Sequence, residues 1–500
     1  MNKKRIFITG ATGNMGFSAF RELLDRRDRF DIVLLARPSK KNKEKLKDYI
    51  DTEGVEVVWG DLTNYSNILK GVTGADFVLH VGGMVSPYAD THPKETMEVN
   101  ITSAEYIVRA IKEQPNCDEI GVVYVGSVAQ MGNRLSPNHW GRTGDPICTS
   151  IFDYYSVSKC ISELIFAESG LKKWVSIRQT GMLYPALLNK ANDPITYHVP
   201  LNGVLEWSTI EDSGRVLANA CEDWVPEHFW RGFYNLSSGE SFRLTNYEFE
   251  SLLLKTISCP PVEKVFEPNW FATKNFHGMW YLDSDKLEEI LKFREKIDCN
   301  SYFKRLKRAL PWYFSLARIA PAWPIKMFMK HVCSTNPLGT LYWFENNNEE
   351  RINAHFGSRA EWEKIPSWKD YRLEELSKTP VILDHGYDES KPTSELDIED
   401  IRKAAQFRGG ELLSQSIVKG DIYTPLEFKC QFGHKFTMTP NTMLKGGHWC
   451  PECLPKYDEK ENQWHFEEIA KGNPFFAQVW YPLHDKSENN VYTEEIYADF

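Results

Sequence analysis

Long apolar runs, an export segment and an excess of basic charge are all lacking in this sequence of 500 residues. No stretch of about eighteen uncharged apolar residues occurs, so the sequence predicts no membrane-spanning helix. The net charge is -10, which disfavours nucleic acid as the main partner because chains that hold phosphate backbones are usually basic. A strand-like run begins at Arg5 and leaves no room for an export segment, so we expect a cytoplasmic protein.

Paired cysteines with the spacing of a disulfide framework are also lacking. The chain has 10 cysteines, and those outside one cluster near its C-terminal end are scattered without regular spacing. This distribution is typical of reduced, mostly buried thiols. The scattered cysteines are Cys117, Cys148, Cys160, Cys221, Cys259, Cys299 and Cys333.

Short β-branched runs that alternate with helical patterns are the main feature of the first 185 residues. The chain is too long for one ordinary core, so two or three domains are expected. Strands that alternate with helices predict βαβ units, and hence an α/β fold with a Rossmann-type, doubly wound parallel sheet. The expected strands are residues 5–9, 31–36, 55–60, 75–81, 120–126 and 175–180.

Changes in composition predict the domain boundaries. An α/β domain should contain a cofactor-binding part followed by a smaller substrate lobe with a further strand near 232–235. An aromatic, proline-interrupted stretch then predicts a helical extension, and a polar linker leads into a compact unit and an aromatic tail. The expected ranges are 1–300 for the α/β domain (cofactor part about 1–185, lobe about 186–300), 301–391 for the extension, 388–397 for the linker, 396–456 for the compact unit and 457–500 for the tail.

Residues 9–16 read TGATGNMG and directly follow the first expected strand. Glycines at these spacings let the backbone turn sharply and approach a pyrophosphate that faces the N-terminus of the next helix. A tight turn without a ligand would have the same pattern, but its place in a βαβ unit favours dinucleotide binding. The expected cofactor contacts here are Thr9, Gly10, Thr12, Gly13, Asn14, Met15 and Gly16.

The end of the second expected strand carries Arg37, with Lys41 close behind. An NAD site normally has a carboxylate at this position, whereas a guanidinium suits a 2′-phosphate. Alternatively, Arg37 and Lys41 could belong to a solvated basic loop without a ligand. We favour the phosphate interpretation and therefore expect NADP(H) in preference to NAD(H). Asp61 and Leu62 follow the third strand, where Asp61 could meet the adenine or simply cap the next helix.

Tyr155 and Lys159 are four residues apart and would share one face of a helix. An ammonium near a phenol favours the phenolate, which suits a general acid/base for alcohol–carbonyl interconversion. Tyrosine and lysine at this spacing often lie on the exposed face of a helix and have no catalytic role. Ser127 adds weight, because it ends the fifth expected strand at the carboxyl edge of the sheet, where its hydroxyl could polarise the same carbonyl.

A set of short motifs in residues 3–300 carries a family resemblance: TGATGNMG (9–16), DL (61–62), HVGG (80–83), VNIT (99–102), Ser127, YSVSK (155–159) and RQTG (178–181). This stretch resembles an extended short-chain dehydrogenase/reductase of the NAD-dependent epimerase/dehydratase superfamily, with a pattern closest to dihydroflavonol reductase-like and 3β-hydroxysteroid dehydrogenase-like members. The resemblance implies that Tyr155 is the acid/base, that Lys159 lowers its pKa and holds the nicotinamide ribose, and that Ser127 orients the carbonyl. It also implies cofactor or supporting contacts from Val81, Gly82, Gly83 and Asn100.

Departures from the family pattern indicate the reaction. Val128 and Ala129 follow Ser127, so the acid that sugar 4,6-dehydratases use for water elimination is missing. Together with Arg37, this favours an NADP(H)-dependent oxidoreductase that interconverts a secondary alcohol and a ketone on a small, apolar or polycyclic substrate. The alternatives are an NAD-dependent nucleotide-sugar epimerase and, from another class, a cofactor-sensing, nucleic-acid-binding regulator. The expected substrate contacts, which could equally be core residues, are Met84, Tyr88, Met131, Met182 and Tyr184.

A basic and aromatic segment opens the helical extension. It could lie on a membrane surface or cap an apolar substrate. We favour a helical pair packed on the core, because most aromatic helices in soluble chains are buried. The segment comprises Lys304, Arg305, Lys307 and Arg308, followed by Trp312, Tyr313, Phe314, Trp323 and Phe328.

Two pairs of metal-ligand residues lie in the compact unit: Cys430 with His434, and Cys450 with Cys453. Three thiolates and one imidazole complete a tetrahedral zinc shell without an open position for catalysis. The surrounding pattern RGG…LS…CxxGH…WCPxC resembles a small zinc-ribbon family. We expect a structural zinc with a stabilising or protein-contact role; nucleic acid binding through the ribbon and a homodimer remain open.

Overall fold

The computed structural model describes residues 3–189, 193–311, 314, 321–457, 464–488, 490 and 492. Trp312 and Tyr313 of the predicted aromatic segment lie outside the described residues, as do parts of the predicted C-terminal tail. Within the part that is described, no helix is long and apolar enough to span a lipid bilayer.

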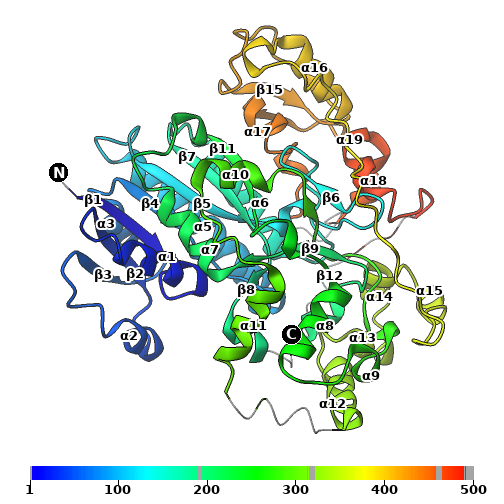
Figure 1. Cartoon of the computed structure of the whole chain (residues 1–500). Coiled ribbons are helices and arrows are strands. Elements are labelled where there is room, and N and C mark those ends of the chain that lie inside the picture. The colour runs from blue at the N-terminus through cyan, green and yellow to red at the C-terminus, as the bar shows by residue number, and fades with distance from the viewer. Residues whose placement is uncertain are drawn as a thin grey trace.

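A seven-stranded parallel sheet forms the centre of the N-terminal half, in the order β11-β7-β5-β4-β1-β2-β3 (Figure 1). The six strands expected in the cofactor part are confirmed, as is the further strand near residues 232–235. Their chain order reverses between β1 and β4, and such a switch point is where doubly wound sheets bind ligands. The strands are β1 (Lys4–Thr9), β2 (Phe30–Ala36), β3 (Val55–Trp59), β4 (Phe77–His80), β5 (Gly121–Ser127), β7 (Trp174–Gln179) and β11 (Gly232–Leu236).

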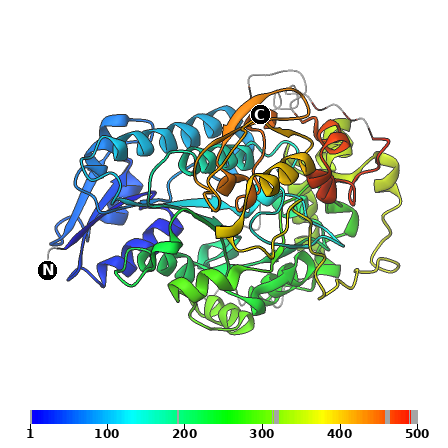
Figure 2. The same ribbon diagram turned by 90° about the horizontal axis from the view of Figure 1, so that it is seen from above.

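Helices cover both faces of this sheet, which explains why its strands read as nearly continuous apolar runs. Figure 2 shows the sheet between the two helical layers. One layer consists of α1 (Asn14–Leu24), α7 (Ile210–Asn219) and α10 (Ser284–Leu291), and the other of α3 (Tyr65–Val72), α5 (Pro93–Lys112) and α6 (Tyr154–Ala167). The short helices α2 (Lys40–Leu46) and α4 (Tyr88–Thr91) lie in the loops after β2 and β4.

The lobe beside the sheet has its own apolar core, which the start of the helical extension completes. Helix α12 buries Met329, Val332 and Cys333 against this core, while Trp323 and Phe328 are 70% and 50% exposed. One face of α12 is therefore packed, as we favoured, and the other is open. The lobe and extension contain β6 (Trp140–Gly141), β8 (Met182–Leu183), β9 (Val204–Glu206), β10 (Ser208–Thr209), β12 (Arg243–Thr245), β13 (Trp280–Tyr281), α8 (Asn246–Thr256), α9 (Val262–Val265), α11 (Cys299–Ala309), α12 (Ala322–Thr335), α13 (Thr340–Glu345), α14 (Glu349–Phe356) and α15 (Arg359–Glu363).

A C-terminal module with a small antiparallel sheet packs near α6 and β11 (Figure 1). Glu168, just after α6, accepts hydrogen bonds from the backbone N–H and hydroxyl of Thr439, and the Asn441 amide donates to the carbonyl of Arg231. The predicted linker also contacts the core, because Glu389 pairs with Arg142. The module and tail contain α16 (Ile398–Phe407), β14 (Glu411–Leu412), β15 (Leu426–Lys429), β16 (Lys435–Met438), α17 (Pro440–Leu444), α18 (Phe466–Gly472) and α19 (Pro474–Trp480).

Candidate active site

The turn after β1 lies directly against the end of β4. Gly10 has φ +66°, and a Cβ on this residue would lie 2.7 Å from both the Cα and the N of Gly82. Thr9 fixes the contact: its hydroxyl accepts from the Gly82 N–H at 3.0 Å and is hydrogen-bonded to His80 Nδ1 at 2.9 Å. Only glycine fits at Gly10, and the resulting backbone cradle is the kind of surface that a pyrophosphate approaches.

The N-terminus of α1 follows this cradle and has no side-chain cap at Gly13. Its first N–H groups are therefore available to an anion. A Cβ on Gly16 would lie 2.3 Å from the carbonyl oxygen of Gly10, so glycine is required there as well. Gly13 and Asn14 are exposed, whereas the side chain of Met15 belongs to the core, and Met15 can offer a cofactor only its backbone.

Cationic side chains gather beside this turn. Arg37 and Lys41 are exposed just beyond β2. Sequence analysis did not identify Lys45, whose Nζ donates to the Thr12 carbonyl at 3.0 Å and lies 4.1 Å from the centre of the Phe17 ring. Burial, together with the charge of Lys41, lowers the pKa of Lys45.

Asp61 and Leu62 lie on the other side of the cradle. The Asp61 carboxylate accepts from the backbone N–H and the hydroxyl of Thr63 at 2.9 and 2.8 Å. Helix α3 is capped by Asn64, so the alternative in which Asp61 caps the next helix is wrong. Leu62 packs against Gly82, since its Cδ1 would lie 3.0 Å from a Cβ there.

Ser127 and Tyr155 meet at the carboxyl edge of the sheet. Ser127 ends β5 and caps the 3-10 helix η1 (Val128–Met131), while Tyr155 lies in the first turn of α6. Burial raises the pKa of Tyr155 to about 12, against the opposing effect of its hydrogen bond with the Ser127 hydroxyl; Asp153 and Asp90 add to the rise. This rise in the pKa of Tyr155 is opposite to the lowering that we expected from the ammonium of Lys159.

Lys159 lies one turn after Tyr155 and is buried. Its Nζ donates to the Val125 carbonyl at 2.7 Å and lies 4.9 Å from the centre of the Tyr124 ring. Burial lowers the pKa of Lys159 to about 8, although the carboxylate of Glu163 opposes the shift. The ammonium is thus held by the backbone of β5 at the same edge of the sheet as Ser127.

Asn100 of α5 joins the segment after β4 to α6. Its amide donates to the Ser158 hydroxyl at 2.9 Å and to the Met84 carbonyl, and its Oδ1 accepts from the Met84 N–H at 2.7 Å. A Cβ on Gly83 would lie 2.7 Å from this Oδ1. Asn100 therefore positions the backbone of residues 82–84, and Val81 is half-buried at the start of this segment.

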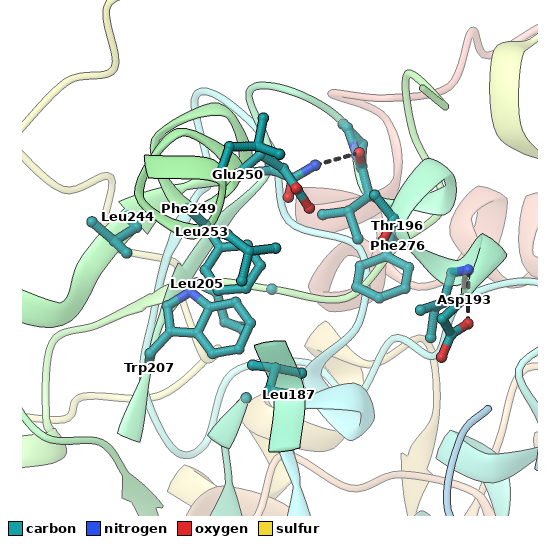
Figure 3. Close-up of a pocket in the computed structure, with 18 of the residues that line it drawn as sticks. Leu187, Asp193, Thr196, Leu205, Trp207, Leu244, Phe249, Glu250, Leu253 and Phe276 are labelled. Atoms are coloured by element: carbon teal, nitrogen blue, oxygen red, sulfur yellow. Dashed lines mark hydrogen bonds between the residues drawn. The ribbon is translucent and has the colours of Figure 1, made fainter. Parts of the chain in front are cut away.

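An apolar cavity of about 410 Å³ lies in the lobe (Figure 3). Of the predicted substrate contacts, Met182 and Tyr184 line it, but Met84, Tyr88 and Met131 do not. Met131 is fully buried in a small core cluster with Met279 and Tyr281, and Tyr88 is 52% exposed. An apolar residue after a strand can face the core, as Met131 does, or the solvent, as Tyr88 does, as readily as a pocket.

Polar residues connect the cavity to the Tyr155 side of the site. His277 lines the cavity, and its Nδ1 lies 3.5 Å from an oxygen of Asp153, the residue that caps α6. Ser86 also lines it and donates to Asp90 at 2.6 Å. Both carboxylates act on the pKa of Tyr155, so the cavity approaches the carboxyl edge of the sheet through His277 and Ser86. Sequence analysis gave no signal for this connection.

The predicted metal ligands Cys430, His434, Cys450 and Cys453 converge, with their ligand atoms within 4.8 Å of one another. The Sγ atoms of Cys430 and Cys453 are 3.8 Å apart, and His434 Nδ1 lies 3.5 and 3.7 Å from the Sγ atoms of Cys453 and Cys450. A tetrahedral ion with bonds of about 2.3 Å to sulfur and about 2.0 Å to nitrogen requires edges of about 3.8 and 3.5 Å. The cluster therefore fits a metal ion of this geometry.

A buried network that sequence analysis missed connects this module to α6. His448 Nε2 and Glu163 Oε1 are 2.7 Å apart, and the guanidinium of Arg178 donates to both carboxylate oxygens of Glu163 and to the Gly446 carbonyl. All three side chains are at most 2% exposed. Although burial opposes it, the charge of Arg178 and the hydrogen bond from His448 hold the pKa of Glu163 below its usual range.

Residues 6–177 match the sequence model of the NAD dependent epimerase/dehydratase family. Among curated proteins, the UDP-glucose 4-epimerase of Rickettsia bellii is 29% identical over 111 residues, covering 21% of this chain and 32% of that protein. The human 3 beta-hydroxysteroid dehydrogenase type 7 is 26% identical over 172 residues, covering 33% of this chain and 44% of that protein. The chain thus spans less than half the length of these relatives. The family match is confined to the N-terminal α/β part of the chain.

Solved structures with a similar fold include the dTDP-glucose 4,6-dehydratase DesIV of Streptomyces venezuelae with NAD and TYD bound. It is 19% identical, with a TM-score of 0.49, and the match covers 62% of this chain and 96% of that chain. The UDP-glucose 4-epimerase of Thermus thermophilus in complex with NAD is 16% identical, with a TM-score of 0.47 and coverage of 61% and 98%.

Proposed function

We propose that the protein is an NADP(H)-dependent oxidoreductase that interconverts a secondary alcohol and a ketone on an apolar substrate. The observation that carries the proposal is the hydrogen-bonded pair of Ser127 and Tyr155 at the sheet edge, beside an apolar cavity. The backbone cradle at Gly10 and Gly82 and the open N-terminus of α1 fit a dinucleotide. A bound nicotinamide dinucleotide would supply the chemistry of hydride transfer.

The proton steps would fall to the chain's own side chains. In the reducing direction, Tyr155 donates its phenolic proton to the forming alkoxide, and Ser127 hydrogen-bonds to the same oxygen. The ammonium of Lys159, held by the Val125 carbonyl, would stabilise the phenolate that remains. In the oxidising direction these roles reverse, and Tyr155 accepts the proton from the alcohol.

Preference for NADP(H) would come from the cations beside the first turn. Arg37 and Lys41 are free on the surface to meet a 2′-phosphate, and Lys45 adds a third positive charge at the Thr12 carbonyl. The residues that directly follow β2 are Arg37, Pro38 and Ser39, and none of them has the carboxylate that would bind a ribose diol.

Zinc at the Cys430, His434, Cys450 and Cys453 cluster would complete the C-terminal module as a structural ion.

A nucleotide-sugar epimerase is the second candidate, favoured by the activity named for the relative from R. bellii. A nucleoside diphosphate needs several cations or N–H donors around its phosphates. Arg134 is the one lysine or arginine among the described residues that line the cavity, and its guanidinium is paired with Asp145 at 3.3 Å. This lining suits an apolar molecule better than a diphosphate.

One pair of assays separates the two candidates. The full chain is incubated with NADPH and a panel of apolar ketones, and separately with NAD and UDP-glucose. We expect NADPH-dependent alcohol formation without conversion of UDP-glucose to UDP-galactose. Epimerisation of UDP-glucose with no ketone reduction would overturn the proposal.

A further inference from the structure

A carboxyl group lies among apolar side chains in the wall of the cavity. Glu250, on α8, is 3% exposed, and its neighbours in the lining include Phe249, Leu253 and Leu254. In Figure 3 the Glu250 carboxyl lies between the side of the cavity formed by Leu253 and Phe249 and the side formed by Thr196 and Phe276. Burying a carboxyl group without a partner costs free energy, so its presence here calls for a reason.

Two other polar side chains in this lining, Asn246 and Asp193, already have partners. The amide of Asn246 donates to the Val199 carbonyl at 2.9 Å, and the carboxylate of Asp193 accepts from the Ile195 N–H at 3.1 Å. The hydroxyl of Tyr197, behind the lining, donates to the Met329 carbonyl. Among the described residues, none forms a hydrogen bond or ion pair with the Glu250 carboxyl. A ligand in the cavity is therefore its natural partner.

The surroundings indicate which group this ligand carries. Burial alone raises the pKa of Glu250 to about 8, so the carboxyl is mostly neutral at pH 7. A neutral carboxyl both donates and accepts a hydrogen bond, which matches a hydroxyl or carbonyl oxygen. It offers little charge to an ammonium ion. Trp207 and Phe249, stacked at 4.2 Å, and the surrounding aliphatic side chains suit an apolar skeleton.

We propose that Glu250 binds a hydroxyl or carbonyl oxygen on an otherwise apolar substrate. This oxygen is a second one, separate from the reacting group, because neither Tyr155 nor Ser127 lines the cavity. The inference rests on the proposed function for the identity of the reacting group. It narrows the substrate class to apolar molecules with two oxygen functions, of which one reacts and the other is held by Glu250.

Displacement of a neutral fluorescent probe, N-phenyl-1-naphthylamine, tests the inference without turnover. Three competitors share a chain of the same length: decan-1-ol, 1-chlorodecane and decylammonium. Affinities are measured for the wild type, Glu250→Leu and Glu250→Gln, with Glu240→Gln as a control because its carboxyl is exposed. Leu253→Trp, which fills the cavity, should abolish probe binding and so locates the probe.

In Glu250→Leu we expect the ratio of the affinity for decan-1-ol to that for 1-chlorodecane to fall about tenfold. A loss of this size corresponds to the loss of one buried hydrogen bond to the alcohol. Glu250→Gln, which keeps a donor and an acceptor, and Glu240→Gln should preserve the ratio. An unchanged ratio in Glu250→Leu would overturn the inference. Tight binding of the cation would also overturn the inference. This would be the case if decylammonium bound the wild type more than tenfold more tightly than decan-1-ol, and if this difference in affinity disappeared in Glu250→Gln. Because no turnover is needed, failure here is distinct from a failure of ketone reduction.

Discussion

His448 of the C-terminal module and Glu163 of α6 are joined by a buried hydrogen bond of 2.7 Å between Nε2 and Oε1. They are 285 positions apart in the sequence. Glu163 lies one helical turn after Lys159, and its carboxylate opposes the lowering of the Lys159 pKa. The module that carries the metal-ligand cluster therefore contributes directly to the charge balance beneath the predicted catalytic helix.

Removal of the His448 side chain should destabilise the fold. In His448→Ala the Glu163 carboxylate keeps Arg178 but loses one buried partner, and we expect the free energy of unfolding to fall by about 1–3 kcal/mol. Urea denaturation followed by tryptophan fluorescence measures this change. His228→Ala, at an exposed position, is the control. Equal stability of the two variants would contradict the structural role of the His448–Glu163 bond.

Loss of the Tyr155 hydroxyl should affect chemistry more than binding. In Tyr155→Phe we expect kcat for ketone reduction to fall by about 10²- to 10⁴-fold, because the proton donor is lost. The affinity for NADPH, measured by quenching of protein fluorescence, should change little. Tyr106→Phe on α5 removes a hydroxyl away from the site and should keep full activity. Turnover in Tyr155→Phe at the rate of the control would exclude the proposed acid/base.

The alkaline side of the pH–rate profile should report Lys159. Its pKa is lowered to about 8 by burial, so the ammonium that the proposed mechanism needs is lost above that pH and kcat should fall. The free energy of unfolding should rise with pH over the range in which kcat falls. The unfolded lysine keeps its proton to about pH 10, so between about pH 8 and 10 the contribution of this group to folding rises with pH.

Lys159→Arg tests this assignment, because arginine keeps its charge throughout that range. Whatever its residual kcat, the variant should show no decline between pH 8 and 10. An alkaline decline of unchanged midpoint in Lys159→Arg would mean that another group titrates.

Arg37 should decide between the two nicotinamide cofactors. Its loss in Arg37→Ala removes a charge-assisted contact to the 2′-phosphate, and we expect NADPH to bind about 10- to 100-fold more weakly. Binding of NADH, which lacks that phosphate, should be unaffected. Titration of both cofactors against the wild type, Arg37→Ala and the exposed control Arg27→Ala provides the comparison. Equal weakening of NADPH and NADH in Arg37→Ala would refute NADP(H) selectivity at this residue.

The metal cluster should hold one zinc ion per chain and contribute to stability. Cys450→Ser removes one of three thiolates, and we expect loss of zinc by mass spectrometry and a fall in Tm of about 5 °C or more. Cys259→Ser, a half-buried thiol far from the cluster in sequence, should keep both. A zinc-free wild type with the same Tm before and after chelation would show that the module is stable without a metal.

The sheet and the first turn were predictable because local sequence determines them. Strands buried on both faces, such as residues 121–127, read as continuous apolar runs, and glycine is required at Gly16 by a backbone contact with Gly10 within one βαβ unit. The convergence of the four metal ligands was also predictable, because their spacing is set by the metal shell.

The cavity and the network beneath α6 were not predictable in this way. Met131 and Met182 are chemically alike, yet one is buried in the core and the other lines the cavity. Glu250 reads as an ordinary polar residue in an amphipathic helix, because its burial depends on the packing of the whole lobe. The pairing of His448 with Glu163 depends on how two distant segments dock, and periodicity carries no information about such contacts.

Transfer of deuterium from NADPH labelled at the reactive carbon tests the central claim most directly. The wild type is incubated with the labelled cofactor and a panel of apolar ketones that carry a second oxygen, and the alcohol products are analysed by mass spectrometry. The proposed function predicts deuterium on the carbinol carbon with the wild type and almost none with Tyr155→Phe. Unlabelled products, or equal labelling by both proteins, would contradict it.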